Sequence, residues 1–139
     1  SPSEEALSSI CDIISLHLPL DQETSNMITL KEIKLMKKES FLINTARGGI
    51  INEKDLFEAL QNKIISGAAI DVFEDEPYQG DLIGLDNCIL TSHMGSMSKD
   101  CRTQMEREAT DEAVRFLMNN VQNSPVPFEE YLLQSERIR

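Results

Sequence analysis

The stretch FLINTARGGIINEKDL, at Phe41–Leu56, decides the fold of this chain. It opens with the apolar run Phe41–Ile43, passes through an arginine and two glycines, and reaches a helix start at Asn52. A short buried strand, a turn and a capped helix are the building units of an α/β protein. Arg47 lies where the strand ends, and open α/β sheets bind their ligands beyond that end of the strands.

Three further apolar segments predict strands on either side of this unit. They are Ile13–Leu18 (IISLHL), the small-residue segment Ala68–Val72, and Cys88–Leu90. Pro19 ends the first of them, because proline cannot donate a hydrogen bond to a sheet ladder.

Helical patterns separate these strands. Thr29 begins a helix through Met36 with Glu32 at the third position, as in a capping box. A long helix over Lys99–Asn119 carries an apolar stripe, made by Met105, Ala109, Ala113 and Leu117. The alternation of strands and helices predicts an α/β fold with a parallel sheet and right-handed crossovers.

Composition limits the classes of protein that fit. The 139 residues are enough for one domain, and 40% are hydrophobic without any run as long as a membrane span. The N-terminal SPSEEALSS has no signal-peptide pattern, so we expect a soluble cytoplasmic protein. Three cysteines without CxxC spacing predict reduced thiols and no metal site.

The net charge of −11 argues against nucleic acid as a partner. It also argues against a general attraction of anionic substrates, so a local cation must hold any anionic ligand. Arg47, beside two glycines, is the clearest candidate for that cation.

Polar side chains follow each of the predicted strands. They are His17, the segment Thr45–Arg47, Asp71 and His93. Because the carboxyl ends of parallel strands meet at one edge, we expect these side chains to form a site there.

This set of residue types suits oxidation of a hydroxyl group. His93 can take the proton, a carboxylate from Asp71–Glu76 can hold the imidazole tautomer, and Arg47 can bind a carboxylate with its planar fork. Each residue alone also has a structural interpretation: Arg47 as a surface arginine, His93 as a turn residue, and the acidic run as a solvated loop. The order of the three, each after a strand, favours the site.

Three motifs in this order, NTARGG, IDVFEDEP and TSHMGSMS, resemble the NAD-dependent D-2-hydroxyacid dehydrogenase family. The segment CDIISLHLPLDQETSNMI is similar to the strand and loop that precede them, so the resemblance spans Cys11–Leu117. It implies a Rossmann-type doubly wound sheet and an oxidoreductase that transfers a hydride between a small 2-hydroxy acid, or its 2-keto acid, and NAD. The choice between NAD and NADP stays open, as does the choice of acid.

The resemblance also implies roles for particular residues. Arg47 matches the substrate-binding arginine, His93 the acid–base histidine, and Glu76 its carboxylate partner. Asp71 matches the residue that contacts the nicotinamide carboxamide. The residues implied to contact the cofactor are Thr45, Ala46, Arg47, Asp71, His93, Ser96, His17, Pro19 and Thr24.

The family's GxGxxG phosphate-binding segment is absent from this sequence. We therefore expect a partial Rossmann sheet that lacks its first strands: residues 1–120 as the C-terminal half of a dinucleotide-binding domain, and 121–139 as a linker and tail returning to a substrate domain. The chain would be the C-terminal part of a longer enzyme. Alone, it should be inactive and bind NAD weakly, and it should self-associate or form a homodimer through the apolar edge at Ile13–Leu16.

Two other functions fit the same residues. One is an NAD-sensing binding module of corepressor type, since such relatives can keep the arginine, glutamate and histidine. The other is an inactive fragment, which the missing phosphate-binding segment favours for this chain taken alone.

Overall fold

The computed structural model describes residues 8–123, which belong to two compact units. The first unit extends to Met94 and the second begins at Gly95. All the strands and all the predicted site residues except Ser96 lie in the first unit. The family-based boundary at residue 120 stays a prediction.

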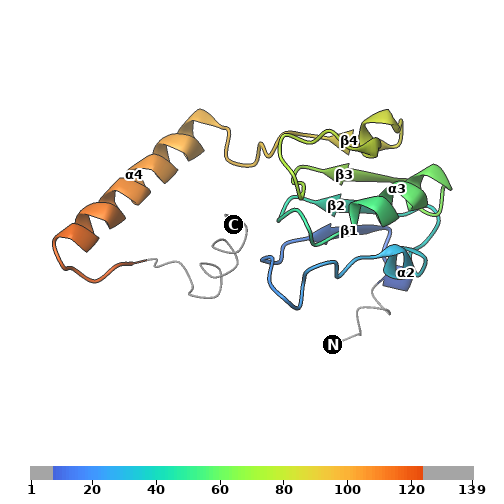
Figure 1. The fold of residues 1–139 in the computed structure, drawn as a ribbon, viewed down its shortest axis with the longest axis horizontal. Helices are drawn as coiled ribbons and strands as arrows, with labels where there is room; N and C mark the ends of the chain where they lie inside the picture. The colour runs from blue at the N-terminus through green and yellow to red at the C-terminus, as the bar shows by residue number, and fades with distance from the viewer. Residues whose placement is uncertain (1–7, 124–139) are drawn as a thin grey trace. The chain divides into compact units, whose positions relative to one another are not determined.

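The first unit is built on a four-stranded parallel sheet in the order β1-β2-β3-β4 (Figure 1). The strands are β1 (Ile13–Leu16), β2 (Phe41–Asn44), β3 (Gly67–Ile70) and β4 (Cys88–Leu90). The predicted α/β class and parallel sheet are therefore confirmed.

Helices α2 (Leu30–Ile33) and α3 (Glu53–Gln61) pack against each other on one side of the sheet, and the short 3₁₀ helix η1 (Asp81–Gly84) precedes β4 (Figure 1). Both predicted caps are present. The Thr29 side chain and the Glu32 carboxylate form a capping box, and the Asn52 side chain accepts the Asp55 N–H at 3.1 Å. These bonds satisfy amide groups that a helix start leaves unpaired.

Alternate residues of the strands face opposite sides of the sheet, and the two sides differ in burial. The covered face carries buried side chains under α2 and α3, namely Leu16, Leu42, Ala68 and Ile70. The open face is formed by Ile13, Phe41, Ile43, Ala69 and Ile89. There, Ile13, Phe41 and Ile89 are 60%, 48% and 68% exposed, and the face has a hollow of about 480 Å³.

Element boundaries differ from the predictions by a few residues. β1 ends at Leu16 and not at Leu18, because β2, its partner, ends at the matching residue Asn44. The first helix ends at Ile33, and its last turn tightens into 3₁₀-type bonds such as Met36 N–H to the Ile33 carbonyl at 3.1 Å. β3 begins earlier than predicted, at Gly67, which pairs with Phe41, and it ends at Ile70 and not at Val72, because Ile70 pairs with Asn44, the last residue of β2.

The second unit contains α4 (Lys99–Leu117), which begins at the N-cap Ser98. None of its described residues is buried, and its apolar residues Met105, Phe116 and Leu117 are more than half exposed. Within residues 8–123, no helix is long and apolar enough to cross a membrane. Of the predicted tail at 121–139, the part beyond residue 123 lies outside the described residues.

Candidate active site

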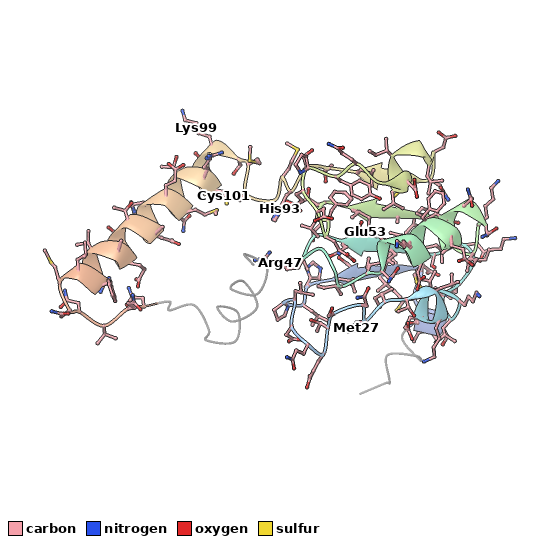
Figure 2. The ribbon with its side chains drawn as sticks, in the orientation of Figure 1. Met27, Arg47, Glu53, His93, Lys99 and Cys101 are labelled. Atoms are coloured by element: carbon pink, nitrogen blue, oxygen red, sulfur yellow. The ribbon has the colours of Figure 1, made fainter. Side chains whose placement is uncertain are left out.

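The strand register brings the candidate residues to one edge of the sheet. Asn44, Ile70 and Leu90 are paired neighbours across β2, β3 and β4, so the chain leaves these strands at the same level. Thr45, Asp71 and Thr91 are the residues that follow. Figure 2 shows Arg47 and His93 at this same end of the sheet. The structure thus places the arginine and the histidine at the same edge of the sheet, as the sequence predicts.

The arginine turn is shaped by the last residue of β2. The Asn44 side chain is buried, donates to the Arg47 carbonyl at 2.9 Å and accepts the Ala46 N–H at 3.1 Å. The Arg47 side chain is exposed, and its Nη1 donates to the Ala46 carbonyl at 2.8 Å. The guanidinium has five N–H donors, so this single bond leaves others for a ligand.

Two glycines let this turn approach the segment after β3. At Gly48, an added Cβ would collide with the Phe73 carbonyl, because the two backbones are in contact. Gly49 has a φ of 84°, a conformation that other residues rarely adopt. The glycine pair thus holds the arginine turn against the segment that carries Glu76.

His93 and Glu76 form a hydrogen-bonded pair. The imidazole Nδ1 lies 3.0 Å from Oε2 and 3.2 Å from Oε1 of Glu76. A carboxylate accepts hydrogen bonds, so this geometry favours the tautomer with the proton on Nδ1. That tautomer leaves the other ring nitrogen, Nε2, as a proton acceptor.

Glu76 is itself held by the backbone. Its Oε1 accepts the Phe73 N–H at 3.1 Å. Partial burial acts to raise the pKa of Glu76, but the hydrogen bonds from Phe73 and His93 outweigh it and hold the pKa below its usual value. Glu76 is therefore ionised at neutral pH.

Asp71 lies between β3 and the histidine turn and is 8% exposed. Its Oδ1 accepts the Thr91 hydroxyl at 2.5 Å and the Met94 N–H at 2.9 Å. Its backbone carbonyl accepts the His93 N–H at 2.7 Å. The role predicted for Asp71, contact with a nicotinamide carboxamide, stays a prediction.

A cleft of about 440 Å³ lies beside the His93–Glu76 pair. The Phe73 and Tyr78 rings that border it stack with their centroids 4.2 Å apart. Its lining is mostly apolar and consists of Phe73, Glu76, Pro77, Tyr78, Ile83, Leu90, Thr91, Ser92 and His93.

The remaining predicted residues have mainly local contacts. His17 is exposed, with Nε2 2.9 Å from the Ser15 hydroxyl oxygen. The Thr24 hydroxyl donates to the Pro19 carbonyl at 2.7 Å, which closes the loop after β1. Thr45 follows β2 and is exposed, and Ser96 belongs to the second unit. Their predicted contacts with a cofactor stay predictions.

Sequence reasoning missed the residues that shape the edge from within. Asn44 is part of the NTARGG motif, and an asparagine ending an apolar strand was a usable signal. The bond between Thr91 and Asp71 joins residues twenty positions apart, so no local sequence pattern predicts it.

The chain matches the family model described as "D-isomer specific 2-hydroxyacid dehydrogenase, NAD binding domain" over residues 2–95. It is 41% identical to glyoxylate reductase of Thermococcus litoralis over 118 residues, which are 84% of this chain and 36% of that protein. It is 36% identical to D-3-phosphoglycerate dehydrogenase of Escherichia coli over 133 residues, which are 91% of this chain and 32% of that protein.

A solved structure of a glyoxylate reductase from Paecilomyes thermophila superposes with a TM-score of 0.84 at 30% identity, covering 91% of this chain and 39% of that one. The chain thus spans about a third of the length of these curated relatives. Since the family model covers most of the chain and the fold agrees, the chain belongs to the NAD-binding domain family of the D-isomer specific 2-hydroxyacid dehydrogenases.

Proposed function

We propose that this chain supplies the acid–base pair and the substrate-binding arginine of an NAD-dependent D-2-hydroxyacid dehydrogenase. The observation that carries the proposal is the 3.0 Å contact between His93 Nδ1 and Glu76 Oε2 at the sheet edge where Arg47 also lies. The substrate class is a small 2-hydroxy acid or the corresponding 2-keto acid.

Arg47 binds the substrate in this proposal. Its guanidinium is exposed at the sheet edge, and its planar fork suits the carboxylate and the C2 oxygen of a 2-hydroxy acid. In a chain with a net charge of −11, such a local cation is needed to hold an anion.

His93 moves the proton. In the oxidation direction, neutral Nε2 takes the proton of the C2 hydroxyl, and the ionised Glu76 carboxylate on Nδ1 stabilises the resulting imidazolium. In the reduction direction, the protonated imidazole gives that proton to the ketone oxygen. The nicotinamide, when bound, accepts or supplies the hydride.

The donor set at the edge fits the nicotinamide half of the cofactor. Asp71, at the end of β3, offers a carboxylate that can accept the N–H groups of a carboxamide. The sequence contains no GxGxxG segment for the pyrophosphate, so we expect this chain alone to bind NADH weakly.

We also propose a cytoplasmic protein that associates as a homodimer. The three free cysteines of the described residues support a reducing compartment. The exposed apolar side chains of the open face support association.

The test is an NADH absorbance assay of the full polypeptide that carries this sequence, against a panel of 2-keto acids. His93→Ala should lower kcat by more than about 100-fold, the lower end for acid–base catalysis. Arg47→Ala should abolish the activity, and Lys34→Ala, on the exposed surface beyond α2, is the matched control that should leave it unchanged.

Three outcomes separate the alternatives. Turnover that depends on Arg47 and His93 supports the dehydrogenase. NADH binding without turnover on any acid selects the sensing module. Neither binding nor turnover selects the inactive fragment.

A further inference from the structure

We propose that Thr91 is a positioning residue, which acts through Asp71 to hold His93 in the orientation needed for proton transfer. The inference rests on the proposed function, because it assigns a helper to the acid–base histidine. It concerns three hydrogen bonds that join the end of β3 to the turn after β4.

The histidine turn has an unusual backbone. His93 has a φ of 52°, in the left-handed region that a side chain with a Cβ disfavours. Such a conformation persists only where surrounding contacts hold it. The hydrogen bonds to Asp71 are those contacts.

Asp71 holds the turn at three points. Its carbonyl accepts the His93 N–H at 2.7 Å, and its Oδ1 accepts the Met94 N–H at 2.9 Å and the Thr91 hydroxyl at 2.5 Å. We call these three bonds the Asp71 clamp. They fix the residue before the turn, the histidine and the residue after it.

Thr91 is the only side-chain donor among the three bonds of the clamp. Its backbone is fixed as well, because its N–H continues the sheet ladder to the Ile70 carbonyl at 3.0 Å. Because the Thr91 backbone is fixed, its hydroxyl holds the carboxylate of the buried Asp71 in one rotamer. In that rotamer Oδ1 accepts the Met94 N–H.

The clamp sets the direction of the imidazole. With the His93 backbone fixed, Nδ1 lies 3.0 Å from Glu76 Oε2, on a carboxylate that the Phe73 N–H also holds. Loss of the Thr91 hydroxyl removes one of the bonds that hold the Asp71 carboxylate, which weakens its hold on the Met94 N–H and lets the imidazole leave Glu76 more often. The ring then spends less time with Nε2 as the proton acceptor.

The experiment compares Thr91→Val with Thr91→Ser in the full polypeptide. Valine keeps the shape and removes the hydroxyl, whereas serine keeps the hydroxyl. In Thr91→Val, amide hydrogen exchange over residues 92–95 should become about tenfold faster, as expected for loss of a hydrogen bond to a charged group, and in Thr91→Ser it should stay near the wild-type rate. Thr110→Val makes the same change on an exposed face of α4 and is the matched control.

Kinetics give the second readout. Thr91→Val should lower kcat about tenfold, a modest part of the acid–base contribution, and leave the KM for the 2-keto acid, which Arg47 binds, within twofold. Thr91→Ser should restore kcat. Histidine ¹⁵N spectra should show a smaller fraction of the Nδ1–H tautomer for His93 in Thr91→Val, with His17 unchanged as the internal reference.

The outcomes distinguish the two proposals. If the wild type reduces no 2-keto acid, the proposed function fails. The amide exchange rates and the His93 tautomer fraction still test the Asp71 clamp in that case. Wild-type exchange and tautomer in Thr91→Val overturn the clamp. If Thr91→Val unfolds throughout the sheet, the wild-type Met94 amide decides: strong protection supports the clamp, and exchange at the rate of an unstructured amide overturns it.

Discussion

The covered face and the open face of the sheet are made by alternate residues of the same strands, yet their surroundings differ. Leu42 on the covered face is fully buried under α2 and α3, whereas Ile89 on the open face is 68% exposed. Parallel sheets are ordinarily buried on both sides. The buried core that stabilises the first unit therefore lies on the covered face. The open face is an apolar surface from which we expect little contribution to stability.

The largest expected effect comes from the covered face. Leu42→Ala should lower the free energy of unfolding by about 3 kcal/mol, because it leaves a cavity where the neighbours cannot collapse. Ile89→Ala should lower it by less than about 1 kcal/mol. Denaturant unfolding of the two variants measures the difference, and equal losses would mean that the open face is covered in solution.

A polar residue within the covered face gives the next effect. Asn44→Ala should cost about 2 kcal/mol, because the amide side chain is buried and joins both Arg47 and Ala46. Asn44→Asp keeps an acceptor for the Ala46 N–H and loses the donor to the Arg47 carbonyl, so it separates the two bonds. Unchanged unfolding of Asn44→Ala would show that the turn holds itself without this side chain.

The edge between the two faces is more exposed, so its electrostatics have smaller effects. The pKa of Glu76 is lowered in the folded chain, so its stabilising contribution is present above the usual glutamate pKa and is lost as pH falls through the lowered value. Because the side chain is 37% exposed, we expect less than about 1 kcal/mol.

Glu76→Gln removes this ionisation and tests it. The difference in unfolding free energy between wild type and variant should shrink as the pH falls below about 4, near the usual pKa of glutamate. A difference that keeps growing as the pH falls from about 4 to 3 would contradict the direction of the shift.

The smallest effect on stability is expected on the open face itself. Ile89→Lys should change the free energy of unfolding by about 0.5 kcal/mol or less, because the side chain is mostly in water. It should nevertheless weaken self-association, since a charge interrupts the apolar surface. Sedimentation velocity over a range of concentrations measures this, with Lys63→Ala as the control, and unchanged association would place the contact elsewhere.

Local signals were enough to predict much of this fold. The capping box at Thr29, the cap at Asn52 and the strand at Cys88–Leu90 depend on neighbouring residues, and each is where the sequence placed it. The ends of β1 and β3 were predicted less well, because a strand ends where its partner ends, and pairing joins residues far apart in sequence.

The candidate site divides in the same way. The motifs predict that Arg47, Glu76 and His93 lie at one edge of the sheet, because each follows a strand, and their roles stay predictions. The contacts that orient them were not predicted, since the Asp71–Thr91 bond and the Phe73 N–H to Glu76 depend on backbone geometry that exists only after folding.

The backbone of Gly48 touches the Phe73 carbonyl so closely that an added Cβ would lie 1.9 Å from its oxygen. The spacing between the loop bearing the guanidinium and the loop bearing the carboxylate is set by a single hydrogen atom where any other residue would have a carbon. A methyl group at position 48 would push the loop of Arg47 away from the loop of Glu76. The substrate-binding and proton-transferring groups would then be further apart, although none of these side chains had been changed.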